Sequence, residues 1–229
     1  MKIQVDSTIF THAEGLKIGV IRYDGIETGA IPSMLVGRLQ LYTENLNTEL
    51  QDKQWSDYPG IMAWRQHFKQ TGADPARYRP SVEALFRRIK KEPQLPAGNS
   101  AIAINNFFSL QYETPLGIYD ISNLTGNVTF KIGTAEDTYE GLNGRSNTLK
   151  GIITSFDEKG PFGSPYVDSV RTSVSNKTDS ALQIIYFHSG INADQASKML
   201  SAISKMFIQI HGGSSSIQLL TKEKMTTEI

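Results

Sequence analysis

The sequence contains no cysteine, which excludes disulfide bonds, thiolate metal ligands and cysteine nucleophiles. It also lacks an apolar run as long as the roughly 18 residues of a membrane-spanning helix, and its N-terminus, "MKIQVDSTIF", has no basic-then-apolar export signal. We therefore expect a cytoplasmic protein without a membrane partner. There is no GxSxG elbow and no phosphate-binding loop, and the four histidines show no metal-ligand spacing. These absences predict no bound metal and no cofactor.

An excess of either charge is also missing, because 23 Lys and Arg balance 23 Asp and Glu. This balance argues against a protein that coats nucleic acid indiscriminately. The distribution is uneven, however: residues 61–92 carry eight basic and three acidic residues, whereas residues 93–129 carry no Lys or Arg and two acids. The basic block is either the solvated face of an ordinary helix or a site for a polyanion, and the charge pattern leaves both interpretations open.

Apolar periodicity and turn residues predict helices in the first part of the chain, strands later and one helix near the end. The late helix is framed by Asn192 as a cap and by Gly212-Gly213 as a stop. The polar tail, 214–229, is expected to be partly loose. This order predicts an α+β fold and a single domain over residues 1–229. We expect helices near 35–50, 61–68, 80–91 and 192–211, and strands near 16–23, 101–110, 117–121, 127–132, 150–156 and 181–188.

The basic block ends in the predicted helix "PSVEALFRRIKK". Its apolar residues recur at helical spacing and predict a face that packs on the core: Val82, Leu85, Phe86 and Ile89. The cations must then point away from the core or flank it. The lysines near the C-terminal end also complement the helix dipole, which is a purely structural reason for their presence.

Two further segments carry polar groups that suit a pocket. The stretch "DEKGPFGSPYVDSVRT" (157–172) sets polar side chains beside a stiff glycine- and proline-rich loop. Such a loop either forms a pocket wall whose amides hold an anion, or it is an ordered turn whose Asp and Ser satisfy their own backbone. In the predicted strand "NNFFSL" (105–110), Asn106 shares a face with Phe108 and is either a structural hydrogen-bonding group or a polar pocket residue.

Five short motifs follow one another along the chain: "YRPSVEALFRRI", "LP" at 95–96, "NNFFSL", "TPLGIYDI" and "LNG". Together they resemble the tRNA-editing domain of the phenylalanyl-tRNA synthetase beta subunit, which combines its third and fourth, B-type domains. They are still more similar to free-standing proteins that consist of that domain alone. The resemblance covers about residues 60–188. It implies an α+β domain with helices that flank mixed and antiparallel sheets, an N-terminal strand-helix part and a C-terminal helix packed on it.

The same resemblance contains departures. The family pattern Pro-x-His-x-Phe-Asp reads Pro-Leu-Gly-Ile-Tyr-Asp over 115–120, so Gly117 stands where the editing histidine falls. The family's aspartate before the strand Asn falls at Ala103. In the synthetase such domains hydrolyse tyrosine wrongly esterified to the phenylalanine tRNA. The departures favour another substrate, or binding without hydrolysis. Nothing in the chain resembles the ATP-binding core of the synthetase, so ATP is not expected as a partner.

The resemblance therefore implies a protein that binds charged tRNA and hydrolyses a mismatched aminoacyl ester in trans, as an aminoacyl-tRNA deacylase. One alternative is a non-catalytic binder of an amino-acid-like ligand or of RNA, and another is a hydrolase for a small substrate unrelated to tRNA. In the first hypothesis Asp137 or Asp168 orients the water. The pocket is lined by Asn106, Asp120, Ser164, Arg171 and Thr172, and phosphates are contacted by Arg79, Arg87, Arg88, Lys90 and Lys91.

Overall fold

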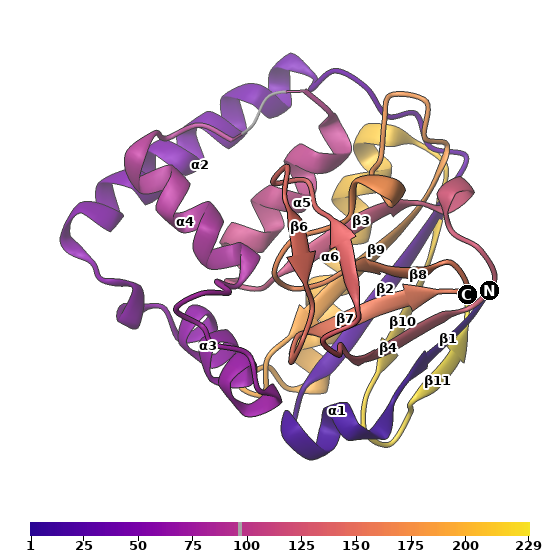
Figure 1. Ribbon diagram of the computed structural model, residues 1–229. Coiled ribbons are helices and arrows are strands. Elements are labelled where there is room, and N and C mark those ends of the chain that lie inside the picture. The colour runs from indigo at the N-terminus through magenta and orange to yellow at the C-terminus, as the bar shows by residue number, and fades with distance from the viewer. Residues whose placement is uncertain (96–97) are drawn as a thin grey trace.

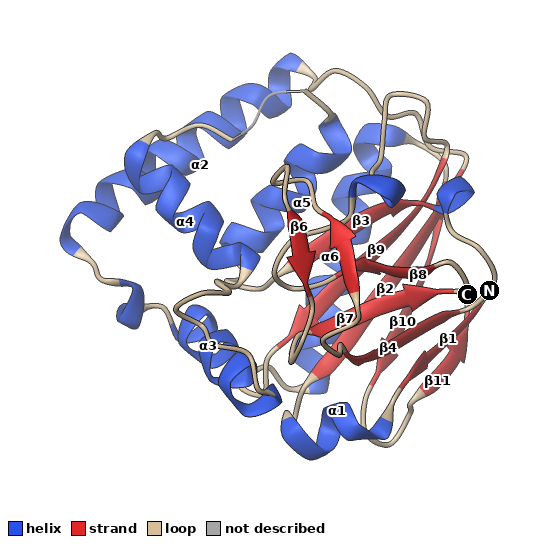
Figure 2. Ribbon diagram, in the orientation of Figure 1, coloured by secondary structure: helices blue, strands red, loops and turns tan. Residues whose placement is uncertain are grey.

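The computed structural model describes residues 1–95 and 98–229. The fold is α+β, as the sequence predicts, with many of the helices gathered beside the strands rather than alternating with them (Figure 2). Two sheets pack face to face, and helices cover the outer face of one of them (Figure 1). Pro96 of the "LP" motif lies outside the described residues.

The first sheet has five strands in the order β11-β1-β4-β7-β8. It is mixed, because β1 and β4 run parallel whereas the other neighbours run antiparallel. The first and last strands of the chain pair at its edge, which places the two termini side by side (Figure 1). The strands are β1 (Lys2–Val5), β4 (Val128–Ile132), β7 (Ile153–Asp157), β8 (Gly160–Gly163) and β11 (Thr226–Glu228).

The second sheet is antiparallel throughout, with the order β10-β2-β9-β3. Its strands are β2 (Lys17–Asp24), β3 (Leu116–Asp120), β9 (Ser180–Phe187) and β10 (Ser214–Leu220). Both faces of β9 are buried, which explains why its sequence is an unbroken apolar run rather than an alternating one. Leu182, Ile184 and Tyr186 belong to the core between the sheets. Ala181, Ile185 and Phe187 belong to the core beneath the helices.

Helices α2, α4, α5 and α6 form the outer layers on one side of the four-stranded sheet, whereas α1 and α3 pack against each other beside the core between the sheets. Helices α5 and α6 contact this sheet directly, whereas α4 packs against α5 and α2 packs against α4. Gly19 of β2 lets α6 approach closely, since a Cβ there would collide with Leu200. The helices are α1 (Ser7–His12), α2 (Ser33–Asp52), α3 (Pro59–Thr71), α4 (Ser81–Lys91), α5 (Ser100–Gln111) and α6 (Ala193–His211), with short 3-10 turns η1 (Trp55–Asp57), η2 (Ile121–Asn123) and η3 (Val170–Thr172).

Residues 101–110 form most of helix α5, so the predicted strand is wrong. Asn99 caps the helix by accepting a hydrogen bond at Oδ1 from the Ala101 amide (2.9 Å). The helix is buried between α4 and the sheet over most of its surface. Its apolar residues therefore make one continuous run, which periodicity cannot distinguish from a buried strand. Consequently Asn106 and Phe108 do not share a face, because residues two apart diverge on a helix.

The tail is more ordered than predicted. Residues of β10 pair with β2 over seven positions, from Ser214 opposite Asp24 to Leu220 opposite Ile18. The last strand, β11, closes the edge of the other sheet beside β1. The polar composition of the tail reflects edge strands with an exposed side rather than loose chain.

The remaining predicted helices and strands are confirmed, with ends that differ by a few residues. The C-terminal helix carries a capping box between Asn192 and Gln195, as its sequence suggests. A small hairpin, β5 (Thr138–Glu140) and β6 (Ser146–Thr148), stands apart from the two sheets. Among the helices that the structure describes, none combines the length and the apolar character that crossing a membrane requires.

Candidate functional site

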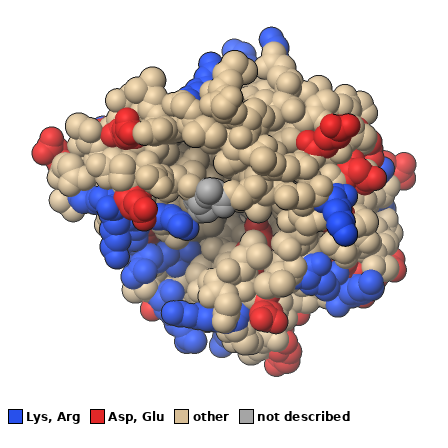
Figure 3. All heavy atoms as spheres, turned by 90° about the horizontal axis from the view of Figure 1, so that it is seen from above, with Lys and Arg blue, Asp and Glu red and all other residues tan. Residues whose placement is uncertain are grey.

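One face of the molecule is hollowed by a groove of about 940 Å³. Figure 3 shows Lys and Arg side chains gathered beside a hollow on one face. Among the described residues that line the groove, seven are Lys or Arg and none is Asp or Glu. We call this surface the basic groove; its cations are Arg77, Arg79, Arg87, Arg88, Lys90, Lys91 and Arg145.

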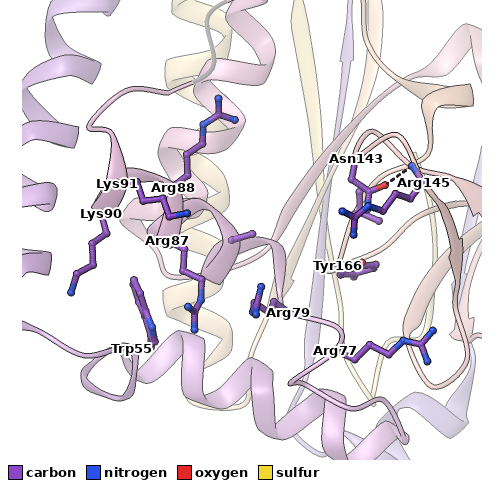
Figure 4. Close-up of a pocket in the computed structure, with 12 residues that line it drawn as sticks. Trp55, Arg77, Arg79, Arg87, Arg88, Lys90, Lys91, Asn143, Arg145 and Tyr166 are labelled. Atoms are coloured by element: carbon purple, nitrogen blue, oxygen red, sulfur yellow. Dashed lines mark hydrogen bonds between the residues drawn. The ribbon is translucent and has the colours of Figure 1, made fainter.

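Helix α4 supplies four of these cations because its opposite face belongs to the core. Val82, Phe86 and Ile89 are buried there, so the positions between them face outward and line the groove (Figure 4). The start of α4 is fixed by the amide of Ser81, which donates a hydrogen bond to the carbonyl oxygen of Pro165 (2.7 Å). This bond ties one wall of the groove to the loop that forms the other.

Trp55 lies beneath two of the cations. The guanidinium of Arg87 is 4.6 Å from the centre of the indole ring, and the ammonium of Lys90 is 5.5 Å from it. Arg87 also donates from Nε to Oε1 of Glu83 (2.9 Å), and Arg65 donates to the same carboxylate. Because Glu83 is fully buried, it needs these charged partners, and Arg87 therefore has a structural role as well as a place in the groove.

The other cations of the basic groove are not tied in this way. In the described part of the chain, no salt bridge engages Arg77, Arg79, Arg88, Lys90, Lys91 or Arg145. Arg79, Arg88, Lys91 and Arg145 are exposed. Concentrating uncompensated cations in a groove raises the local potential for anions. The arrangement favours the polyanion interpretation of the basic block over the solvated face of a helix.

The wall opposite α4 comes from the β5–β6 hairpin and the loop after β8. In the hairpin turn, Oδ1 of Asn143 accepts a hydrogen bond from the Arg145 amide (3.2 Å; Figure 4). In the loop, the ring of Tyr166 packs edge-on against Tyr78, with 5.3 Å between ring centres. The hairpin turn and the loop that form this wall are therefore each held by a contact of their own.

A second, smaller cavity of about 360 Å³ adjoins the groove. The two share part of their lining, namely Ala84, Arg88, Asn143, Tyr166 and Val167. We call the smaller space the side cavity. Its apolar wall is formed by Leu85, Ile102, Leu116, Ile118, Leu142 and Val174. Its polar lining includes Asn105, Asn106, Ser164, Asp168 and Ser173.

Asp168 is the carboxyl group of the side cavity. Its Oδ1 accepts a hydrogen bond from the hydroxyl of Tyr119 (2.6 Å). Burial raises the pKa of Asp168 to about 7, even though the bond from Tyr119 acts in the opposite direction. A carboxyl group with a raised pKa at a cavity wall is typical of a general base that works near neutral pH.

Ser164 lies at the base of the same loop and supports its shape. Its Oγ accepts hydrogen bonds from the amides of Tyr166 (3.3 Å) and Val167 (3.2 Å), and it lies 2.9 Å from the hydroxyl of Tyr139. These amides are thus engaged within the turn. At Ser164 the loop is therefore an ordered turn in which the serine satisfies the hydrogen bonds of its own backbone. The residue also lines the side cavity.

Asn105 and Asn106 both line the side cavity, which the predicted strand would not have allowed. Asn105 is buried and structurally engaged: its Nδ2 donates to the Leu116 carbonyl (3.1 Å) and its Oδ1 accepts from Gln183 (3.0 Å). Asn106 is half-buried and makes no side-chain hydrogen bond within the described residues. Helix α5 therefore presents the predicted Asn106 to the cavity beside a fixed neighbour.

The two other acidic candidates serve their own turns. Oδ2 of Asp137 accepts hydrogen bonds from the amide and the hydroxyl of Thr134 (2.8 and 2.9 Å). Asp120 is buried, caps η2 through the Ser122 amide (2.9 Å) and accepts from Thr178 (2.6 Å). Neither residue is among the described residues that line the groove or the side cavity.

Arg171 and Thr172 are likewise engaged elsewhere. Arg171 makes a bidentate ion pair with Asp157, with both N···O distances at 2.9 Å. This pair, together with backbone hydrogen bonds to the same carboxylate, holds the pKa of Asp157 below its usual value against the opposing and largest effect of burial. Thr172 is fully buried, with its hydroxyl 3.4 Å from the Phe162 carbonyl. The structure does not bring either residue to the side cavity.

Sequence reasoning overlooked several groove and cavity residues. Arg77 lies inside the basic block, but Arg145 comes from a distant hairpin and only the tertiary fold brings it near α4. Trp55 precedes the basic block, and no sequence pattern marked it as a groove residue. Tyr119 was not singled out by any sequence pattern. In the described part of the chain no group of three His, Asp or Glu residues is placed to hold a metal ion.

Comparison with known proteins assigns the chain to a family. The family model for the B3/4 domain matches residues 63–211. The chain belongs to the B3/4 domain family, which confirms the resemblance drawn from the motifs, and the match extends through helix α6.

Two relatives illustrate the likeness. The chain is 35% identical over 222 residues to the uncharacterized protein YhzB of Bacillus subtilis (strain 168), covering 96% of this chain and all of that protein. It is also similar to an N-terminal fragment of the phenylalanyl-tRNA synthetase beta subunit from Pyrococcus horikoshii, with a TM-score of 0.47 and 11% identity. That likeness covers 93% of this chain, which spans about half (49%) of the fragment.

Proposed function

We propose that this protein binds aminoacyl-tRNA and hydrolyses a mismatched aminoacyl ester in trans. The observation that carries the proposal is the junction of two spaces: a groove lined by seven cations adjoins a smaller cavity that holds a carboxyl group with a raised pKa. The resemblance of the sequence to the synthetase editing domain supports tRNA as the polyanion.

The basic groove suits the end of an RNA strand. Its free cations contact phosphates, and the half-buried ring of Trp55 offers a stacking surface for a base. Arg88 lines both spaces, so it lies where the last phosphate of the strand meets the side cavity. The acyl group then enters the side cavity, where the apolar wall contacts the amino-acid side chain.

The reaction is hydrolysis of an ester. The Asp168 carboxylate removes a proton from a water molecule while the oxygen of that water attacks the carbonyl carbon of the ester. The new bond joins that carbon to the water oxygen, and the bond from the carbon to the ribose oxygen breaks. The leaving ribose oxygen takes the proton from Asp168, which returns to the carboxylate. The products are a free amino acid and an uncharged tRNA.

The test is a deacylation assay with a panel of correctly and wrongly charged tRNAs. We expect selective release of one amino acid, and a loss of about 100-fold in rate for Asp168→Ala, the size typical of a missing general base. Asp137→Ala is the matched variant, because it removes the other predicted carboxylate, which lies away from the cavity. Loss of activity in Asp137→Ala but not in Asp168→Ala would contradict the assignment.

A non-catalytic binder of an amino-acid-like ligand or of RNA is the second candidate. Gly117 favours it, because the position of the family's editing histidine carries no side chain here. Tight binding of charged tRNA without any release, with the tRNA shown to be intact, would support this candidate against hydrolysis.

A further inference from the structure

The hydroxyl of Tyr119 lies between two glycines and contacts Asp168, a residue that lines the side cavity. Gly117 lies on β3 and Gly163 on β8, and a Cβ added at either position would overlap the Tyr119 hydroxyl. The ring itself is fully buried and packs edge-on against Phe162, with 4.9 Å between ring centres. The two glycines thus leave the space that this hydroxyl occupies.

The hydroxyl is directed at Asp168. The O···O distance of 2.6 Å is short, as expected for a donor to a carboxylate. A phenylalanine would fill the ring space equally well, and a buried hydroxyl lowers stability unless it is hydrogen-bonded. The space kept by the glycines and the aim of the hydroxyl therefore indicate a role beyond packing.

We propose that Tyr119 is a positioning residue that holds the Asp168 carboxylate toward the side cavity, so that it removes the proton from the attacking water. The inference rests on the proposed function. Tyr119 itself stays protonated and exchanges no proton: the proton from water passes to Asp168 and then to the ribose oxygen. Gly117 has a matching role, since the absence of its side chain makes room for the hydroxyl.

Among the described residues, three other ionisable side chains lie near Asp168. Tyr139 of β5 and Tyr186 of β9 lie close enough to interact with its charge, and Arg88 of α4 lines the same cavity. The hydroxyls of both tyrosines have other partners, Ser164 and Ser155 respectively. In the described part of the chain, the hydroxyl of Tyr119 is the side-chain hydroxyl that contacts this carboxylate.

The test compares Tyr119→Phe with Tyr58→Phe. Tyr58 is a matched control, because its ring is also buried and its hydroxyl also lies near a carboxylate, Glu49 (3.4 Å), but in the separate core of α2, α3 and α4. For Tyr119→Phe we expect kcat for deacylation to fall about 10-fold, a part of the roughly 100-fold or larger contribution of a general base, because the base is displaced rather than removed. We expect little change in KM. The acid limb of the pH profile should move to higher pH, because the carboxylate loses a stabilising hydrogen bond. Tyr58→Phe should change neither.

A second readout does not depend on activity. Carbon NMR of the Asp168 carboxyl group should show its titration moving upward in Tyr119→Phe and unchanged in Tyr58→Phe. An active wild type with an unaltered kcat and pH profile in Tyr119→Phe would overturn the inference alone. A lower kcat with an unmoved titration would also overturn it, since Tyr119 would then act through packing. Absence of any deacylation by the wild type would overturn the proposed function and the inference with it.

Discussion

Asp168 occupies a position that favours function over stability. The carboxyl group is desolvated at the wall of a cavity, and burial raises its pKa to about 7. In the unfolded chain the same group ionises near its ordinary value of 3.8. Above that value the unfolded state gains from ionisation while the folded state does not, so the group lowers stability progressively as the pH rises from 3.8 toward 7.

Asp168→Asn is therefore expected to stabilise the protein while it slows deacylation by about 100-fold. The gain should be absent below about pH 4, grow as the pH rises and level off above about pH 7. We expect about 1 to 2 kcal/mol at pH 8, less than the full linkage value because water reaches the cavity. Chemical denaturation of both proteins from pH 4 to pH 8 measures this difference, and a gain that is constant or falls with pH would contradict it.

Helix α4 divides its cations between two tasks. Arg87 is held by Glu83 and stacked on Trp55, so its removal disturbs the helix as well as the groove. Arg88 is exposed and has no salt bridge within the described residues. Arg145, on the opposite wall, is likewise exposed. Substitution of these two residues, rather than of Arg87, therefore tests RNA binding without disturbing the stability of the helix.

Arg88→Ala combined with Arg145→Ala should weaken tRNA binding and flatten its salt dependence. Each lost phosphate contact should reduce the log–log slope of affinity against salt by about 0.7 to 0.9. Lys198→Ala combined with Lys205→Ala on helix α6 removes the same charge from exposed positions that do not line the groove. Equal slopes for the two double variants, measured by filter binding at several salt concentrations, would exclude the basic groove as the RNA surface.

Helix α5 carries both asparagines of the side cavity, and its N-terminus depends on Asn99. Asn99→Ala should lower the free energy of unfolding by about 1 kcal/mol, because two amides lose their acceptor. Asn45→Ala makes the same change at an exposed position inside α2, where alanine favours the helix, and should be neutral or slightly stabilising. Urea denaturation of both variants measures the difference. An Asn99→Ala variant as stable as the wild type would show that the cap is dispensable.

At the scale of the whole molecule, the groove and the side cavity are built from segments far apart in the chain. Trp55, the α4 helix, the turn around Asn143 and the loop around Tyr166 meet on one face (Figure 4). Trp55 and α4 pack on the core that α2 and α3 share with them, whereas Tyr166 packs against the core between the two sheets. The side cavity adjoins the basic groove, so the charged strand and the apolar end of the proposed ligand would lie in neighbouring spaces.

The local patterns predicted the α4 helix, its outward cations and most strands, because amphipathic periodicity depends only on neighbouring residues. The same logic failed for α5, whose burial on most sides removes the periodic signal. The sequence predicted Asp168, Arg171 and Asp120 alike as residues of the site. Only the tertiary partners of the latter two, Asp157 and Thr178, show that these residues are structural. Long-range pairing of this kind leaves no trace in local spacing.

The most direct test of the central claim is the affinity for an amide-linked, non-hydrolysable aminoacyl-tRNA compared with that for the same tRNA uncharged. If the groove and the side cavity form one site, the charged analogue should bind at least about 10-fold more tightly, a difference of about 1.4 kcal/mol. Ile118→Trp, which fills the side cavity, should remove that difference and leave the affinity for uncharged tRNA intact. Equal affinity of the wild type for both tRNAs would contradict the claim that the side cavity receives the acyl group.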